Sequence, residues 1–355
     1  MSQDDPLKAP EQSEAEPSGS GIAARRAFNK RLLFATVITT AILLCLLEGA
    51  ARLCYRDQEV FVPDPYLLFS PQKNLVNFKI KTPRATYWLS TTSDGFRTWI
   101  GAGPVTVAKP PGTYRILCLG DSVTFGNIGI SDNETYPYYL QRILSAKNLT
   151  KPVQVINGGC MGYSSLQGLE FYRRTAMKYR PDLLIIAFLN NDIHPQMVTD
   201  RERLSSSEAA KILKTSLQKS AFYRMLRARL SGEEIFESMR GKSNFTSRVP
   251  YEEYRENMEE FLSLASSEGT EVIFLNLPIN TSSMRPDETH YRAAVYDLAF
   301  CNNAGYIDLV DLFTNYQNYH HKYLFSDLIH PNPEGNEVMA SHIAGYLQEK
   351  GYLTK

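Results

Sequence analysis

Short apolar runs rich in Val, Ile and Leu alternate with longer amphipathic stretches over most of the chain after residue 113. The apolar runs lie at 115–120, 153–157, 183–189, 271–277 and 306–310. They show little polar alternation, which is typical of strands covered on both faces. Helical periodicity fills the intervals between them. Five strands separated by helices predict an open, mostly parallel five-stranded sheet in a three-layer α/β/α fold.

The N-terminal region has a different pattern. Residues 1–31 are polar and rich in Ser, Pro and Glu, a composition that buries too little apolar surface to fold, so a disordered tail is predicted. An uncharged apolar run follows at 32–47 and extends to residue 53 if Glu48 and Arg52 reach the interface. Its length is near the minimum for a helix that crosses a bilayer. The sequence therefore predicts a transmembrane anchor at 32–53.

Basic residues before the apolar run set its expected orientation: Arg25, Arg26, Lys30 and Arg31. Positive charge stays on the cytoplasmic side, so we expect a single-pass membrane protein with a cytoplasmic N-terminus and a periplasmic or extracellular folded part. A cleaved signal peptide with its site at 49–51 is the alternative. The long polar region before the run disfavours it, and both interpretations export the folded part.

Two stretches lie outside the strand and helix alternation. Residues 54–112 combine a half-exposed strand pattern with a proline-containing loop, and we expect a β-rich lead-in packed on the domain at 113–355. A helical insert at about 196–250 contains a basic amphipathic segment. We interpret its apolar stripe, which includes Ile212, Leu213 and Leu217, as packing on the domain. Binding to anionic lipid or covering a substrate cleft are the alternatives.

Composition and charge exclude several function classes. The 38 basic and 38 acidic residues give a net charge of zero, which removes the electrostatic case for nucleic acid as a partner. No phosphate-binding glycine motif follows a strand. The pair His320 and His321 has no third ligand nearby, and no cysteine spacing suits zinc. The sequence predicts no metal and no cofactor.

Candidate chemistry lies just after the predicted strands. Ligands of open parallel sheets bind beyond the carboxyl ends of the strands, and polar residues follow four of these ends: Asp121, Ser122, Asn157, Asn191, Asp192, Asp327 and His330. A serine hydroxyl becomes a nucleophile when an imidazole accepts its proton and a carboxylate orients that imidazole. Preorganised N–H donors then stabilise the oxyanion. Together these residues can supply every part of an acyl-transfer site.

The four segments that follow these strand ends resemble, in the same order along the chain, the sequence blocks of the SGNH, or GDSL-type, hydrolases. The resemblance covers residue 115 to about residue 347 and implies a flavodoxin-like sheet. It carries the nucleophile onto Ser122 in "GDSVTFG", and the acid and base onto Asp327 and His330 in "DLIH". The lead-in "DGFRT…KPPGTYRILCLGDS" also resembles that of membrane-anchored bacterial members.

The same resemblance implies the oxyanion donors. They are the backbone N–H of Ser122, that of Gly162 and the side-chain amide of Asn191. Gly159 is an alternative glycine donor. Supporting roles fall to three further residues, of which the first is expected to brace the turn before the nucleophile: Asp121, Asn157 and Asp192. Ser122 is also expected to begin a helix whose dipole favours negative charge.

The implied activity is that of an exported serine esterase that works through an acyl-enzyme on a small-molecule, carbohydrate or lipid ester. An O-acyltransferase of surface polysaccharide and a catalytically silent glycan-binding scaffold are the alternatives. Two other residues are weaker candidates. His194 is interpreted as a residue that lines the loop after Asn191, and Ser164 does not fit the G-x-S-x-G motif of ordinary α/β-hydrolases.

Overall fold

The computed structural model describes residues 19–54, 60–83, 85–226, 245–280 and 288–354. The chain divides into two compact units. The first comprises Met1–Arg56 and Ser220–Arg229, and the second comprises Asp57–Lys219 and Leu230–Lys355. The two units are built on different principles.

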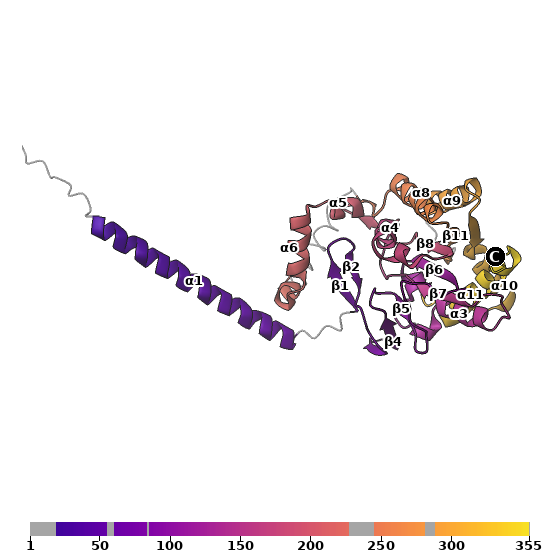
Figure 1. Ribbon diagram of the computed structural model, residues 1–355, viewed down its shortest axis with the longest axis horizontal. Coiled ribbons are helices and arrows are strands. Elements are labelled where there is room, and N and C mark those ends of the chain that lie inside the picture. Colours follow the sequence, from indigo (N-terminus) through magenta and orange to yellow (C-terminus); the bar gives the residue numbers. More distant parts are fainter. Residues whose placement is uncertain (1–18, 55–59, 84, 227–244, 281–287, 355) are drawn as a thin grey trace, which may run out of the picture. The chain divides into compact units, whose positions relative to one another are not determined.

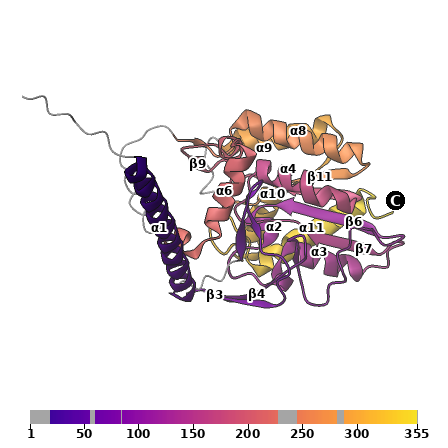
Figure 2. The same cartoon turned by 60° about the vertical axis from the view of Figure 1, so that its left-hand side comes forward.

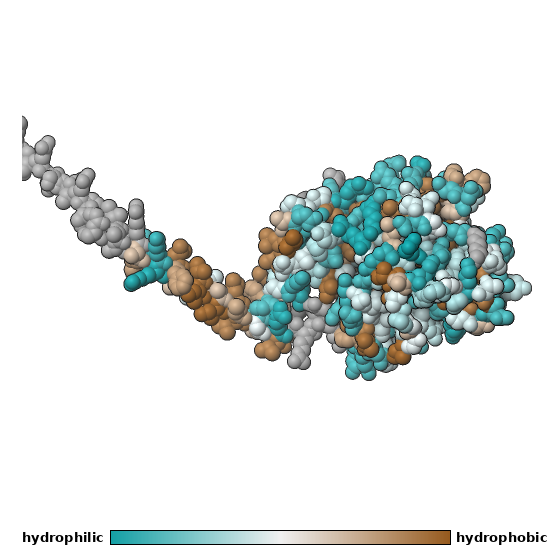
Figure 3. Space-filling view, in the orientation of Figure 1, coloured by the Kyte–Doolittle hydropathy of each residue, from teal (hydrophilic) through white to brown (hydrophobic). Residues whose placement is uncertain are grey.

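The first unit is dominated by one long helix, α1 (Gly19–Cys54). Its part Ala27–Cys54 contains an 18-residue window with a mean hydropathy of 2.2, enough to span a membrane or to act as a signal sequence, and its apolar side chains form a brown run in Figure 3. The helix begins at Gly19 rather than at Leu32. Residues 19–31 are therefore helical where a disordered tail is predicted, and their alanines and arginines favour this state. The rest of that tail lies outside the described residues.

Near its C-terminal end, α1 binds a short helix at 221–226. The Ser220 hydroxyl donates to Glu48 Oε2 at 2.7 Å, and the backbone N–H groups of Ala221 and Phe222 donate to the same carboxylate at 3.0 Å. These N–H groups have no acceptor within their own helix. Glu48 therefore caps the helix and holds residues 220–222 to α1.

The second unit contains a mixed sheet that has eight strands among the described residues. Its order is β12-β11-β8-β6-β7-β5-β4-β3. Five of these strands are parallel: β6 (Tyr114–Gly120), β7 (Val153–Asn157), β8 (Leu183–Ala187), β11 (Glu271–Asn276) and β12 (Gly305–Asp308). Taken in chain order, they have the 2-1-3-4-5 arrangement of a flavodoxin-like sheet. The predicted fold class is confirmed.

The lead-in extends this sheet instead of packing on it as a separate layer. Its antiparallel strands are β3 (Phe78–Lys81), β4 (Thr86–Thr91) and β5 (Arg97–Thr98). β5 pairs with β7 through Arg97 and Asn157. A separate hairpin comes before them, formed by β1 (Phe61–Asp64) and β2 (Leu68–Pro71). The central sheet thus continues without a break from the parallel strands into the lead-in.

Helices cover both faces of the parallel strands, as Figures 1 and 2 show. One face carries α3 (Tyr136–Ser145) and α11 (Pro333–Glu349), and the other carries α4 (Ser165–Phe171), α8 (Tyr251–Ser267) and α9 (Glu288–Cys301). The remaining elements are α2 (Ser122–Phe125), α5 (Asp200–Leu204), α6 (Glu208–Gln218), α10 (Leu309–His320), β9 (Pro195–Gln196), β10 (Thr246–Ser247), a π-turn at Tyr172–Ala176 and 3₁₀ turns at Asp132–Glu134 and Met177–Tyr179. Every residue of β6 is buried.

A buried arginine ties the lead-in to the segment after β6. Arg97 is 2% exposed and donates to Asp132 Oδ1 at 2.9 Å. It also donates to the backbone oxygens of Phe125 at 2.7 Å and Ile130 at 2.6 Å. The cation therefore has a carboxylate partner and further acceptors, the conditions under which a buried charge is tolerated.

We expect Arg97→Ala to lower the free energy of unfolding by about 3 to 5 kcal/mol, because the buried Asp132 carboxylate loses its counter-ion. Arg255→Ala, which removes an exposed ion pair with Glu259, is the matched control and should cost at most about 1 kcal/mol. Urea unfolding of the purified full chain measures both. Equal losses in the two variants would contradict the structural role assigned to Arg97.

Candidate active site

The end of β6 presents Ser122 in a tight turn. A Cβ on Gly120 would lie 2.1 Å from Thr124 Oγ1, so only glycine fits at this position. Asp121 caps the next helix, since its Oδ1 accepts from Val123 N–H at 2.8 Å. That helix, α2, has only 4 residues. The expected dipole contribution is therefore small, because a macrodipole requires several aligned turns.

Three polar side chains from distant parts of the sequence meet beyond β6. Ser122 Oγ lies 2.7 Å from His330 Nε2, and His330 Nδ1 lies 2.7 Å from Asp327 Oδ2. Asp327 also accepts from the backbone N–H groups of Ile329 and His330, each at 2.9 Å. The short loop after α10 therefore folds back on itself and directs the imidazole at the hydroxyl.

The Asp327 carboxylate sets the tautomer of His330. Partial burial opposes ionisation, but the hydrogen bonds from Ile329 and His330 outweigh it and hold the pKa of Asp327 below its ordinary value. An ionised carboxylate only accepts hydrogen bonds, so the imidazole proton is on Nδ1. Nε2 is then free to accept the proton of the Ser122 hydroxyl.

A further residue, which the sequence analysis missed, touches the same carboxylate. Asn127 Nδ2 lies 3.4 Å from Asp327 Oδ2. Asn127 follows Gly126, whose φ of 97° marks a sharp turn at the end of α2. The only signal in the sequence for Asn127 was its position directly after a glycine. That position gives no indication of a partner two hundred residues away.

Hydrogen bonds in the loop after β7 distinguish between the two candidate glycine donors. The N–H of Gly159 donates to Asn157 Oδ1 at 3.0 Å, and Asn157 Nδ2 donates to Thr124 O at 2.8 Å. Gly162, with φ of 79°, lies in a turn closed by Tyr163 N–H and Cys160 O, a geometry that favours glycine. Its own N–H has no hydrogen-bond partner among the described residues. Gly162 is thus the glycine whose donor is available.

Asn191, in the loop after β8, lies beside both other loops. Its Nδ2 donates to Tyr163 O at 3.0 Å and lies 3.5 Å from Asp121 Oδ2. An amide nitrogen carries two hydrogens. The bond to Tyr163 therefore orients the side chain and leaves the second N–H directed toward the end of β6.

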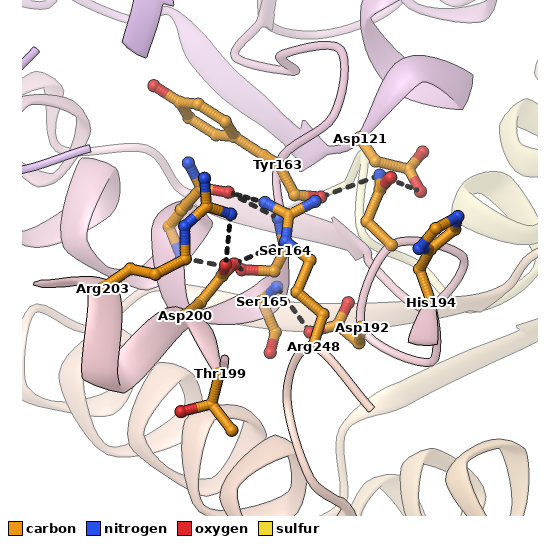
Figure 4. A network of polar contacts seen from close by, with 12 residues as sticks. Asp121, Tyr163, Ser164, Ser165, Asp192, His194, Thr199, Asp200, Arg203 and Arg248 are labelled. Carbon is orange, nitrogen blue, oxygen red and sulfur yellow. Dashed lines mark hydrogen bonds and ion pairs between the residues drawn. The ribbon is translucent and has the colours of Figure 1, made fainter. Parts of the chain in front are cut away.

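A buried polar network holds the loop that carries Asn191 (Figure 4). Asp192 Oδ1 accepts from Ser165 N–H at 2.8 Å. Arg248 Nε donates to Asp200 Oδ2 at 2.7 Å, and the Ser164 hydroxyl donates to the same oxygen at 2.7 Å. Asp200 is fully buried and Arg248 is 8% exposed. Neither member of this ion pair could be identified from the sequence, since both lie in the insert and follow no motif.

The insert is joined to the Asn191 loop through backbone bonds. The N–H of Arg248 donates to His194 O, and that of Val249 donates to Asp192 O, each at 2.9 Å. The two short strands β9 and β10 pair at the base of the insert. Both ends of the insert are thus anchored directly beside the loop that carries Asn191.

Two of the supporting carboxyl groups, Asp121 and Asp192, are fully buried. Burial raises the pKa of Asp121 to about 6 and that of Asp192 to about 7. Asp192 Oδ2 has no hydrogen-bond partner. Desolvation of the charged form is the dominant cause in both cases.

The weaker candidates make no contact with Ser122, Asp327 or His330 among the hydrogen bonds of the described residues. The His194 ring contacts the Pro195 carbonyl at 3.1 Å, and the Ser164 hydroxyl caps α4 and binds Asp200. His320 and His321 end α10. Within the described part of the chain, no group of His, Cys, Asp and Glu side chains could hold a metal ion.

Comparison with known proteins gives one family and several structures. The model of the GDSL-like Lipase/Acylhydrolase family matches residues 118–338. No curated protein gives a significant match. A lipase/acylhydrolase from Enterococcus faecalis is 18% identical and superposes with a TM-score of 0.46, covering 67% of this chain and 96% of its own.

Two further structures have similar sequence identity, TM-score and coverage. The acetyl xylan esterase AlAXEase is 16% identical with a TM-score of 0.46, covering 66% of this chain and 99% of its own. The acetylxylan esterase Axe2 from Geobacillus stearothermophilus is 17% identical with a TM-score of 0.43, covering 66% and 93%.

We expect Asp192→Asn to flatten the pH dependence of stability. Because the pKa of Asp192 is raised above 3.8 to about 7 in the folded protein, the folded state binds this proton more tightly than the unfolded chain. The wild type should therefore lose stability as pH rises from roughly 4 to 7, at about 1.4 kcal/mol per pKa unit. The variant keeps an oxygen for Ser165 and should lack the Asp192 part of this loss, while the smaller part due to Asp121 remains.

The measurement is urea unfolding of the full chain across this pH range. Asp297→Asn, at an exposed position on α9, is the control and should follow the wild-type curve. If Asp192→Asn also follows that curve, the buried carboxyl does not carry the effect.

Proposed function

The chain belongs to the GDSL-like lipase/acylhydrolase family of ester-bond hydrolases, and on this premise we propose that it is an exported, membrane-anchored serine esterase with Ser122 as its nucleophile. The observation that carries the proposal is the pair of 2.7 Å contacts that link Ser122 Oγ through His330 to Asp327. These are hydrogen-bond distances for a nucleophile, its base and the group that orients the base.

The proposed reaction has two halves. Ser122 Oγ attacks the carbonyl carbon of the ester while His330 Nε2 takes the hydroxyl proton. Collapse of the tetrahedral intermediate breaks the bond to the alcohol, which leaves with that proton, and an acyl-serine remains. Water, deprotonated by His330, then attacks the acyl-serine. The bond to Ser122 Oγ breaks, the carboxylic acid is released, and His330 returns the proton to the Ser122 oxygen.

Three donors are proposed for the oxyanion: the N–H of Ser122, the N–H of Gly162 and the amide of Asn191. Ser122 is the first residue of α2, so its N–H has no acceptor within the helix. The open N–H of Gly162 supports its choice over Gly159, whose N–H is already donated to Asn157. Asp121, Asn157 and Asp192 act as positioning residues, since each bonds the backbone of a loop that carries a donor or the nucleophile.

The membrane part of the proposal rests on α1. Ala27–Cys54 is long and apolar enough to cross a bilayer, and Arg25, Lys30 and Arg31 precede or begin the apolar run. Positive charge at this end favours a cytoplasmic N-terminus. The proposed active site then lies outside the cytoplasm.

We expect Ser122→Ala to abolish ester hydrolysis and labelling by a fluorophosphonate, because both need the Ser122 oxygen. Ser326→Ala, which alters an exposed serine next to Asp327, is the matched control and should keep both activities. Circular dichroism checks that the two variants are folded. Normal hydrolysis by a folded Ser122→Ala protein would refute the assignment.

We also expect Asn191→Ala to lower kcat by roughly 10² to 10³ with little change in KM, the usual cost of one oxyanion donor. Asn191→Asp should be similarly impaired because it replaces the N–H donors with an acceptor. Steady-state kinetics on a short-chain ester measure the effect. A change confined to KM would assign Asn191 to substrate binding instead.

Supplying glycan hydroxyls together with the acyl ester separates hydrolysis from acyl transfer. We expect the free acid as the main product, because no part of the proposed mechanism requires an acceptor other than water. Acylated glycan as the main product would make the protein an O-acyltransferase with the same nucleophile.

A further inference from the structure

The apolar stripe of α6 faces away from the domain. Ile212, Leu213 and Leu217 are 57%, 62% and 44% exposed, and Figure 3 shows apolar surface in the region of α6. A helix on a globular domain normally buries such a stripe, and the sequence analysis interprets it in that way. This interpretation is wrong for α6.

The opposite face of α6 holds the helix to the domain through polar contacts. Tyr66 OH donates to Glu208 Oε2 at 3.2 Å, and Lys211 Nζ lies 5.7 Å from the centroid of the same ring. Thr215 is buried on this side. The helix is therefore amphipathic but packed with its polar face inward. Its outward apolar face is a consequence of specific contacts with the β1–β2 hairpin.

Basic side chains border the apolar stripe. Lys214 and Lys219 are exposed, and Lys211 is half-buried. A helix with an apolar face and flanking lysines is typical of segments that lie in the headgroup region of a bilayer. Lysines close to anionic lipid are attracted to its phosphates. The charge pattern therefore favours an anionic membrane surface over a neutral one.

In sequence, α6 leads directly into the segment held by the apolar helix α1. Ser220 follows the end of α6 by two residues, and its hydroxyl donates to Glu48 on α1. A stripe on an 11-residue helix is also small compared with the ~800 Å² per partner of a standard protein interface. Both observations favour a bilayer over a second protein as the occupant.

We propose that α6 lies on the outer surface of an anionic bilayer, with Leu213 and Leu217 among the upper acyl chains and Lys214 and Lys219 at the phosphates. The inference rests on the proposed membrane anchoring by α1 but concerns a second, separate lipid contact. Such a helix sits about 5 to 10 Å into the boundary between headgroups and acyl chains. The β1–β2 hairpin and the domain would then have a defined orientation toward the membrane.

The test places a tryptophan on the stripe. The full-length Leu213→Trp variant is reconstituted in nanodiscs of phosphatidylcholine and phosphatidylglycerol whose acyl chains are brominated and quench nearby indoles. Wild-type protein supplies the background from Trp88 and Trp99. Tyr319→Trp, at an 86% exposed position on α10, is the matched control. We expect the indole on α6 to be quenched at least about twofold more than the one on α10, given its depth in the bilayer.

A second variant tests the charges. Lys214→Glu combined with Lys219→Glu should reduce the quenching of the α6 indole in anionic nanodiscs toward its value in pure phosphatidylcholine. The thermal midpoint of the domain should not change, because both side chains are exposed. Unchanged quenching would overturn the role of the lysines.

Three outcomes separate the alternatives. Equal quenching at α6 and α10 overturns the proposal. Weak quenching at α6 also overturns the proposal if the protein forms dimers that the substitutions Leu213→Asp and Leu217→Asp dissociate. In that case a second copy of the chain covers the stripe. If the chain does not insert into nanodiscs at all, the anchor proposal fails. Quenching of the α6 indole by added anionic vesicles would still support the lipid contact of α6.

Discussion

The geometry of the candidate active site depends on a close approach of three backbone segments beyond β6. A Cβ on Gly120 would lie 2.6 Å from the carbonyl oxygen of Ala187, and one on Gly159 would lie 2.4 Å from the nitrogen of Phe125. Any side chain at these two positions would force the segments apart. The Ser122 hydroxyl is therefore located by backbone packing, which is stiffer than the choice of a rotamer.

The polar groups around this backbone reduce the stability of the fold but fix the positions of nearby backbone N–H groups. Asp121 and Asp192 are fully buried carboxyls with raised pKa values, and a buried ion pair such as Arg248 with Asp200 contributes little net stability. Apolar residues of similar size would pack at lower cost. These side chains instead orient backbone N–H groups and the Asn191 loop, as is common where a fold gives up stability at a functional site.

The five parallel strands could be predicted because runs buried on both faces leave a clear apolar signal. The residues at their ends could be singled out because those ends meet at one edge of the sheet. The continuation of the sheet into β3–β5, and the contacts of Arg97 and Asn127, depend on pairings between distant segments that leave no periodic pattern. For α6, periodicity identified the apolar stripe but not the side on which its neighbours lie.

The insert begins and ends at one short ladder, in which β9 pairs with β10, and the buried pair of Asp200 and Arg248 lies next to it. The entropy of closing a loop changes slowly with its length, by about 0.6 kcal/mol for each doubling. Insert segments of different length can therefore replace one another between β9 and β10 during evolution without moving Asn191. Substrate range can diversify in such an architecture independently of the bond-breaking chemistry.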